Sequence, residues 1–450
     1  MAHSGRRASL LRALILLVFA GTVHNARSLA SLGSAVHANE DQTNSSVRDA
    51  GVRSVPSDIP RRGGFPLWPA GEGINATTVL AWLDFAAMDA RIHRTFGFHN
   101  WPTHPAVVVR NNDGRYVFAY SGPVAETLPS ATSFRRGRIA PTESIFHEAI
   151  NHFDGGDSID GLPLAKLYQL LDDGVPIPLV LDITDMQQCA TNYSAHWGPV
   201  FFEKLPVWSH SIRVDCKHAF GLPGYGYLGG LRRNETEWDA QHQVWDAKYP
   251  WKMKERIAVW RGTTSGTGWR QRMLEVTAQS PLVDARVVTG KDRTAALPFV
   301  DFQKYRAVLD VDGNAWSERF PKLLCMNVPV IKVAPQWLDY HDFTAKPFVH
   351  FVPAPLNESL IDAVNWTLAP ENEAMVRAIV QNARVRCREN MLRERVMEDL
   401  VFQLAAYVEM LDRDSPGWTE RFVAWRNSTS SRKLFPGLSD GQLRPLTIAR

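Results

Sequence analysis

Short apolar segments alternate with amphipathic ones through the second half of this 450-residue chain. The apolar segments have the length of buried strands, and the segments between them follow the 3.6-residue repeat of helices. This alternation predicts an α/β domain with a parallel sheet and helices on both faces. The expected strands are Ile257–Trp260, Arg286–Thr289, Tyr305–Val311, Val328–Val333 and Phe348–Val352, and the expected helices are Trp269–Ala278, Ala315–Met326, Glu358–Leu368 and Glu371 to about Leu411.

The first half of the chain is less regular. Two β-rich runs, Ala106–Val109 and Tyr116–Tyr120, flank the turn signal Asn111–Gly114, and this pattern predicts a hairpin. A helical pattern follows at Leu164–Leu171. Beyond it, Pro178–Leu181 is typical of a buried strand.

The length of the chain predicts two domains, because a single hydrophobic core usually stops growing at ~250–300 residues. The patterns place an N-terminal domain at 66–250, a C-terminal domain with closing helices at 251–412 and a C-terminal tail at 413–450. The net charge of +3 argues against a dedicated nucleic-acid binder.

The N-terminal 65 residues have the pattern of a targeting segment and a stem. Arg6, Arg7 and Arg12 precede the apolar run Ala13–Ala20, which is shorter than the ~20 residues that span a bilayer. We expect residues 1–23 to be a signal peptide, which is favoured over a short membrane anchor of the type II kind. The polar composition of residues 24–65 predicts a disordered stem.

Asn-X-Ser/Thr sequons and cysteines indicate a secretory environment. Seven sequons occur where chance would give roughly two, which predicts a glycosylated lumenal protein. The four cysteines allow up to two disulfides of open connectivity, and their spacing does not resemble a zinc site. The last residues are not a KDEL-type signal, which favours the Golgi over the endoplasmic reticulum. The sequons are at Asn44, Asn75, Asn192, Asn234, Asn357, Asn365 and Asn427, and the cysteines are Cys189, Cys216, Cys325 and Cys387.

Two predicted strand-to-helix turns carry candidate anion-binding chemistry. The first turn contains Arg261, Gly262 and Thr263, with further glycines and hydroxyls up to Gly268. Backbone N–H groups at such a turn favour anions, and an arginine can add a bidentate contact to a phosphate. The Gly-Lys-Ser/Thr of a P-loop is missing, which argues against nucleotide hydrolysis.

The second turn follows the expected strand Tyr305–Val311 and covers Asp312–Phe320. The helical pattern places Ser317 and Arg319 in the first turn of the next helix, where both can face a diphosphate. Ligands of open parallel sheets bind beyond the carboxyl ends of the strands, where both turns are expected to lie.

The segments Trp260–Gly262, Asp312–Phe320 and Pro329–Lys332 together resemble the Rumi-type protein O-glucosyltransferases, a family that includes the fungal capsule-associated-protein xylosyltransferases. Trp337 and the run Pro347–Pro353 extend the likeness, which covers roughly residues 178–411. The resemblance implies a GT-B fold, in which two Rossmann-like domains with parallel sheets face each other and a helical segment closes the C-terminus. It also implies inverting transfer from a UDP-sugar without a metal or any other cofactor.

The resemblance implies roles for individual residues. Asp185, just after the strand Pro178–Leu181, takes the position of the base that accepts the proton of the acceptor hydroxyl, with Asp182 as the alternative. Arg261 and Arg319 take the diphosphate-binding positions. The implied UDP-sugar-binding set is Arg261, Gly262, Thr263, Asp312, Gly313, Asn314, Ala315, Trp316, Ser317 and Arg319.

The implied donor is UDP-glucose or UDP-xylose, and the acceptor is a hydroxyl of a glycoprotein serine or of a glycan. The sequence departs from the family pattern at Asp339, where the family usually has Glu, and at Gly221–Tyr227, which matches the acceptor loop of the family poorly. The resemblance therefore leaves the acceptor open.

Two alternatives remain at this point. Asp310 and Asp312 form an Asp-X-Asp pair, the metal-binding signature of the GT-A architecture, which predicts a metal-dependent transferase. The other alternative is an inactive carbohydrate-binding or scaffold protein of the same fold.

Overall fold

The computed structural model describes residues 103–110, 114–120, 144–153, 164–182, 207–213, 219–223, 234–264, 268–290, 293–340 and 342–426. The predicted signal peptide and stem lie outside these residues, as do Asp185, Cys189 and Cys216. None of the described helices is both long enough and apolar enough to cross a membrane.

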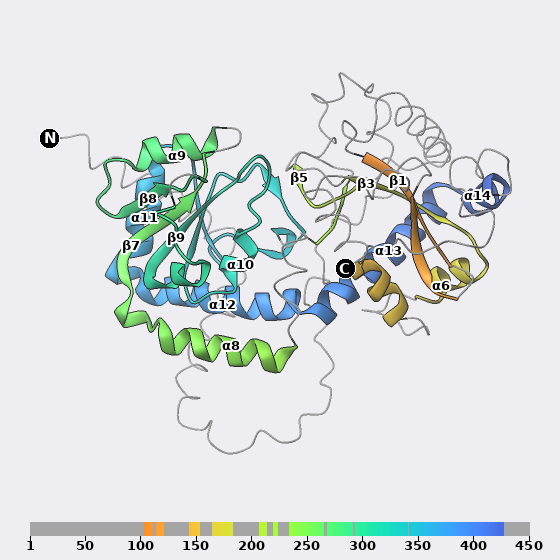
Figure 1. Ribbon diagram of the computed structural model, residues 1–450, viewed down its shortest axis with the longest axis horizontal. Helices are drawn as coiled ribbons and strands as arrows, with labels where there is room; N and C mark the ends of the chain where they lie inside the picture. Colours follow the sequence, from red (N-terminus) through yellow and green to blue (C-terminus); the bar gives the residue numbers. More distant parts are fainter. Residues whose placement is uncertain are drawn as a thin grey trace, which may run out of the picture. The chain divides into compact units, whose positions relative to one another are not determined.

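The C-terminal sheet is fully parallel, as the alternating pattern predicted (Figure 1). Its spatial order is β8-β7-β9-β10-β12, with every neighbouring pair parallel. The chain order therefore changes direction between β7 and β9, which makes the gap between their carboxyl ends the switch point of the sheet. The strands are β7 (Glu255–Gly262), β8 (Val283–Val287), β9 (Tyr305–Val311), β10 (Val330–Val333) and β12 (Val352–Ala354).

Helices cover both faces of this sheet. Successive side chains of a strand point to opposite faces, and β7 has apolar side chains on both, so each face needs helices to bury it. Ala258 and Trp260 pack in a core with α9 and α11, whereas Val259 packs in a second core with α10 and α12 (Figure 1). The helices are α9 (Trp269–Thr277), α10 (Phe320–Leu324), α11 (Ser359–Leu368) and α12 (Glu373–Met391). A further helix, α8 (Glu235–Lys248), is ion-paired to α12 through Asp246 and Arg384 at 3.0 Å.

Four of the predicted elements in this domain differ clearly from the observed ones, and the others agree with them to within two residues at each end. β8 begins three residues early because this strand is only half-buried and lacks a clear apolar pattern. β12 begins only at Val352, since Phe348 is exposed and has a left-handed φ of 59°. The long helix expected from Glu371 breaks at Leu392, which has extended backbone and a buried side chain, so that α13 (Arg393–Asp414) is a separate helix. The helix expected from Ala315 begins only at Phe320.

The N-terminal sheet is mixed, which corrects the expectation that both sheets are parallel. Its order is β2-β1-β3-β4-β6, in which β1 is antiparallel to both of its neighbours. The predicted hairpin is confirmed and explains the difference, because a short turn can join only antiparallel strands. The section β3-β4-β6 is parallel. The strands are β1 (Thr103–Arg110), β2 (Tyr116–Tyr120), β3 (Ile177–Asp182), β4 (Val207–Ser209) and β6 (Ala219–Gly221).

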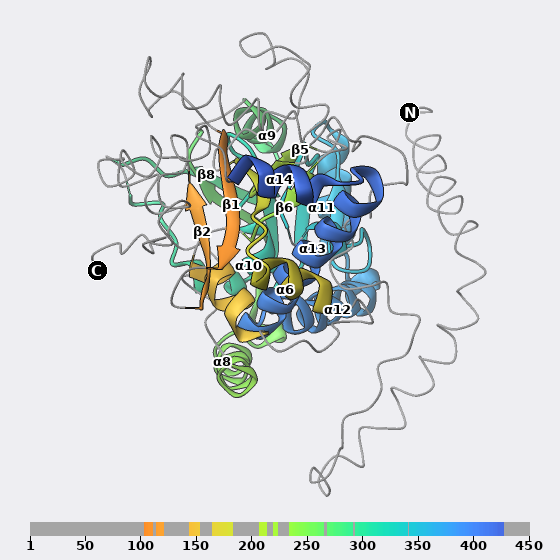
Figure 2. The same cartoon turned by 90° about the vertical axis from the view of Figure 1, so that its right-hand side faces the viewer.

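α13 completes the core of the N-terminal sheet. The helices α13, α6 (Ala165–Asp172) and α14 (Trp418–Arg426) lie beside β1 and share one hydrophobic core with it (Figure 2). The Tyr407 hydroxyl donates to the carbonyl oxygen of Pro178 on β3 at 2.7 Å. α13 thus belongs to the core of the N-terminal sheet, although it follows the C-terminal sheet in sequence. The two parts of the chain are also joined by a two-stranded ribbon of β5 (Ile212–Arg213) and β11 (Trp337–Leu338).

His350, in the loop before β12, is expected to make the free energy of unfolding depend on pH. His350 accepts a hydrogen bond at Nδ1 from the Lys346 backbone N–H at 2.9 Å, which requires the neutral ring. Burial and the charges of Arg386 and Lys346 lower the pKa of His350 to about 4. An unfolded histidine titrates near 6.5, so the unfolded chain binds more protons between these values, and stability is lost as the pH falls from 6.5 towards 4.

We expect the free energy of unfolding to fall by on the order of 2 kcal/mol between pH 7 and pH 5 through His350. His350→Asn keeps an acceptor that does not titrate and should flatten this dependence in urea unfolding. Burial raises the pKa of Asp342 to about 6, so this residue makes the protein more stable as the pH falls, opposite to His350. Its contribution is the same in the wild type and in the His350 variant. An unchanged pH dependence in the variant would refute the role of His350.

Candidate functional site

The candidate site lies at the carboxyl ends of β7 and β9, which are neighbours in the sheet. Residues 262–264 and 268 of the turn after β7 are described, and we call the turn after β9, residues 312–319, the β9 loop. Both predicted anion-binding turns are therefore at the switch point, where open α/β sheets bind their ligands.

Two glycines allow large side chains to approach these turns closely. A Cβ on Gly262 would lie 2.7 Å from the ring of Trp260, and one on Gly313 would lie 2.9 Å from Nη2 of Arg270. Real Cβ atoms do not come this near to other heavy atoms, so a side chain at position 262 would clash with the buried Trp260 ring, and one at position 313 would displace the Arg270 guanidinium. Gly313 thus lets Arg270, in the first turn of α9, pass directly over the β9 loop.

Arg261 is held against the neighbouring strand through Nη1 and Nη2, and its buried Nε has no hydrogen-bond partner among the described residues. Its Nη2 lies 2.5 Å from the Asp284 carboxylate, and its Nη1 donates to the carbonyl oxygens of Trp260 and Asp284. Burial alone would raise the pKa of Asp284, but hydrogen bonds from Arg261 and Arg286 hold it below its ordinary value. In this arrangement Arg261 fixes the end of β7 and presents its own carbonyl oxygen to Arg319.

Arg319 and Arg270 bring positive charge to the site, and neither forms a direct ion pair among the described residues. Arg319 donates from Nη1 to the Arg261 carbonyl oxygen, and its guanidinium carbon lies 6.0 Å from the centre of the Trp260 ring. Arg270 donates to the carbonyl oxygen of Thr263 at 3.2 Å. Burial lowers the pKa of both groups, and the charge of Arg319 lowers that of Arg270 further.

Each of these arginines retains a buried nitrogen without a hydrogen-bond partner among the described residues. These atoms are Nη2 of Arg319 and Nε of Arg270. A buried donor left unpaired in this way needs an explanation, which a water molecule or a bound anion can supply, and guanidinium groups bind anions such as phosphate well. Sequence reasoning missed Arg270, although its place just after a glycine-rich turn was a signal.

The β9 loop is held by side chains and not by helix formation, which corrects the predicted helical turn at Ser317 and Arg319. The Ser317 hydroxyl donates to Asp310 at 2.6 Å, and Ala315 and Trp316 pack against Trp337. Of the predicted binding residues in this loop, only Asn314 is exposed. α10 has only five residues, so the positive charge comes from side chains and not from a helix end.

Asp310 and Asp312 are both ion-paired to Lys332. Its Nζ lies 2.8 Å from Asp310 Oδ2 and 3.0 Å from Asp312 Oδ1. Burial alone would lower the pKa of Lys332, but the two carboxylates raise it, so the ammonium is charged. An ammonium thus lies between the two carboxylates that the GT-A alternative assigns to a metal.

Of the two candidate bases, the structure describes only Asp182. Asp185 is outside the described residues, whereas Asp182 is the last residue of β3 and pairs in register with Ser209 of β4. The acceptor segment begins at Gly221, the last residue of β6, and is described only to Pro223. Asp339 is fully buried, and its backbone N–H donates to Asp342.

Three of the predicted glycosylation residues are described, and all three are exposed. Asn234 caps α8 through its side chain, Asn357 accepts from the backbone N–H of Ser359, and Asn365 lies on α11. The others, at Asn44, Asn75, Asn192 and Asn427, lie outside the described residues.

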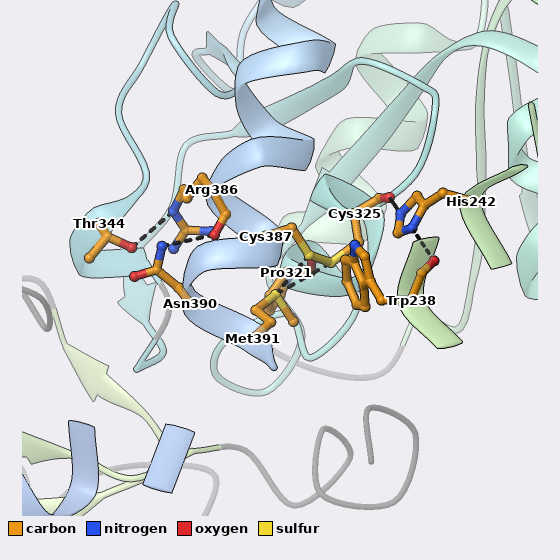
Figure 3. The surroundings of a disulfide bond; sticks show 9 residues. All are labelled: Trp238, His242, Pro321, Cys325, Thr344, Arg386, Cys387, Asn390 and Met391. Atoms are coloured by element: carbon orange, nitrogen blue, oxygen red, sulfur yellow. Dashed lines mark hydrogen bonds between the residues drawn. A yellow bond between two sulfur atoms is a disulfide. The ribbon is translucent and has the colours of Figure 1, made fainter. Parts of the chain in front are cut away.

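A disulfide joins Cys325, just after α10, to Cys387 on α12 (Figure 3). Trp238 of α8 and Met391 pack around it, and all four side chains are buried. The connectivity left open by the sequence is thereby settled for this pair.

The fold is that of an α/β protein, and guanidinium groups with unpaired nitrogens lie at the switch point of its open parallel sheet, the place where such sheets bind their ligands. The model of the family Glycosyl transferase family 90 matches residues 164–419, more than half of the chain. The protein belongs to this family, and the resemblance inferred from its motifs is confirmed.

Individual relatives are more distant. The chain is 28% identical over 234 residues to the O-glucosyltransferase rumi homolog of Anopheles gambiae. This alignment covers 46% of this chain and 56% of the relative. It is 27% identical to human Protein O-glucosyltransferase 1 over 33% of this chain and 43% of the relative. For human Protein O-glucosyltransferase 3 the identity is 27%, over 30% of this chain and 31% of the relative. The chain thus spans from about a third to just over half of the length of these relatives.

Proposed function

We propose that the protein transfers glucose or xylose from a UDP-sugar to a hydroxyl of a glycoprotein or glycan, with inversion and without a metal. The observation that carries this proposal is the pair of arginines, Arg319 and Arg270, with unpaired buried nitrogens at the switch point. Membership of glycosyl transferase family 90 supports glycosyl transfer, and the relatives that are named as protein O-glucosyltransferases support glucose and a protein acceptor.

In the proposed reaction the arginines stabilise the leaving group. As the acceptor oxygen attacks the anomeric carbon, the bond from that carbon to the UDP oxygen breaks and negative charge grows on the diphosphate. Arg319 and Arg270 donate hydrogen bonds to that charge in a buried place, where preorganised donors are most effective. Arg261 holds the end of β7 and orients Arg319 through its carbonyl oxygen.

The base must come from elsewhere, since the arginines can only donate. We assign this role to Asp185, in a GT-B arrangement in which the N-terminal domain faces the switch point. Asp185 takes the proton of the acceptor hydroxyl, so the products are the glycoside, UDP and the protonated carboxyl group.

Asp185→Asn is expected to lower transfer at least about 100-fold, because general bases contribute that much or more. UDP binding measured by calorimetry should stay unchanged, since the carboxylate does not contact the diphosphate. Asp173→Asn, an exposed carboxylate shortly before β3, is the matched control and should leave transfer intact. Full transfer by the Asp185 variant would remove this residue from the mechanism.

Transfer is expected to persist in EDTA, because Lys332 lies between the carboxylates that a GT-A metal would need. The assay compares initial rates with and without the chelator, using UDP-glucose, UDP-xylose and UDP-galactose as donors. Activity that is lost in EDTA and restored by manganese would favour the metal-dependent alternative.

The proposed location is the lumen of the secretory pathway. The buried Cys325–Cys387 disulfide and the exposed sequon asparagines support an oxidising compartment with glycosylation. We infer the Golgi rather than the endoplasmic reticulum.

A further inference from the structure

A buried lysine lies beneath the candidate site and belongs to none of the predicted binding positions. Lys332 is 1% exposed and pairs in register with Asp310 across β10 and β9. Its Nζ contacts the Asp310 and Asp312 carboxylates and lies 4.4 Å from the centre of the Phe320 ring. The ammonium thus has two anions and an aromatic face around it, which compensates its burial.

The second oxygen of each carboxylate holds a different piece of backbone. Asp310 Oδ1 accepts from the Ser317 hydroxyl at 2.6 Å, which fixes the β9 loop two residues before Arg319. Asp312 Oδ2 accepts from the backbone N–H groups of Gln336 and Trp337 at 2.8 and 3.2 Å. One ammonium therefore organises two carboxylates, and these organise both the β9 loop and the segment after β10.

The segment after β10 is under backbone strain. Ala334 has a φ of 34°, a conformation that a residue with a side chain keeps only when its surroundings enforce it. Gln336 and Trp337 follow after Pro335, and Trp337 is the first residue of β11 in the ribbon with β5. The contacts of Asp312 are thus placed where the chain needs to be held.

The same charges act on the arginines of the site. Asp310 raises the pKa of Arg319, against the effect of burial, and Asp310 and Asp312 do so for Arg270. Without the ammonium, the two carboxylates would lack their only direct ion-pair partner among the described residues, beside the place proposed for the diphosphate, and removing one partner of a buried ion pair is strongly unfavourable.

We propose that Lys332 is a positioning residue of the donor site: its ammonium joins Asp310 and Asp312 and thereby fixes the β9 loop and neutralises the charge beneath the donor diphosphate. This inference rests on the proposed function for the identity of the ligand. The positioning of the loop itself does not depend on that function.

Lys332→Met keeps most of the side-chain volume and removes the charge. We expect UDP binding, measured by calorimetry, to weaken at least about tenfold, and the donor KM to rise while the acceptor KM stays unchanged. A merely destabilised protein would lose kcat with both KM values unchanged. Hydrogen exchange should accelerate in peptides that cover residues 312–319 and 334–338.

Lys304→Met is the matched control, because Lys304 is an exposed lysine paired with Asp301 at 2.8 Å at the other end of β9. It should leave UDP binding and exchange unchanged. If Lys332→Met does not fold, Asp312→Asn replaces it in the experiment. This substitution keeps the shape of the side chain but removes one of the two carboxylates that are ion-paired to Lys332. The same shifts are expected in that variant.

The outcomes separate the two proposals. A folded Lys332 variant, or failing that Asp312→Asn, with wild-type UDP affinity and wild-type exchange would overturn the positioning role. A wild-type protein that does not bind UDP would overturn the proposed function instead, and the exchange measurement would still decide the role of Lys332.

Discussion

Arg319→Ala is expected to weaken UDP binding about 100-fold, because removing one partner of a buried charge-assisted contact costs roughly 2–5 kcal/mol. The structure gives two reasons for so large an effect. The unpaired Nη2 of Arg319 is buried, so a charged contact made by this atom is screened little by solvent. Its Nη1 is held by the Arg261 carbonyl oxygen, so little ordering is needed when the ligand binds.

Calorimetric titration with UDP checks this prediction. Arg272→Ala is the matched control, since Arg272 lies on the same helix as Arg270 but is half-exposed and faces Glu275 and Glu358. The control should bind UDP like the wild type. An Arg319 variant with unchanged affinity would mean that the diphosphate does not bind at the switch point.

Replacing both Cys325 and Cys387 by Ala is expected to lower the free energy of unfolding by about 4 kcal/mol, from the entropy of the chain that the bond closes off. The two cysteines are 62 residues apart in sequence. The bond also anchors α10, which begins directly after Arg319, to α12 (Figure 3). Urea unfolding of the wild type and the double variant measures the difference.

Met391→Leu provides the control for packing around the disulfide, because Met391 contacts both sulfur atoms but carries no covalent link. Such a volume-conserving exchange usually costs less than about 1.5 kcal/mol. A double-cysteine variant no less stable than Met391→Leu would show that the disulfide does not stabilise the fold.

The parallel domain could be predicted from the sequence where local and tertiary forces agree. Tyr305–Val311 was predicted with the observed boundaries because its residues from Ala307 onward are buried and its apolar run ends at a turn. The start of α10 could not be predicted, since the hydrogen bond of Ser317 to Asp310 and the pairing of Asp312 with Lys332 override the helical pattern there.

The sequence predicted where the candidate site lies, but not the contacts that its side chains make. The two turns and Arg319 followed from motifs, whereas the occupation of Arg261 by Asp284 depends on the pairing of β7 with β8. Arg270 approaches the β9 loop closely at Gly313, which lies 43 positions further along the chain and has no side chain to displace it. Lys332 did leave a signal, because a lysine inside an apolar strand requires buried partners.

Titration of the wild-type protein with UDP and with uridine, by calorimetry under identical conditions, tests the central claim most directly. If Arg319 and Arg270 hold the diphosphate of a sugar nucleotide, UDP binds at least about 30-fold more tightly than uridine, since charged hydrogen bonds contribute roughly 1.5–3 kcal/mol each. Equal affinities, or no binding of UDP, would contradict a donor site at the switch point of β7 and β9.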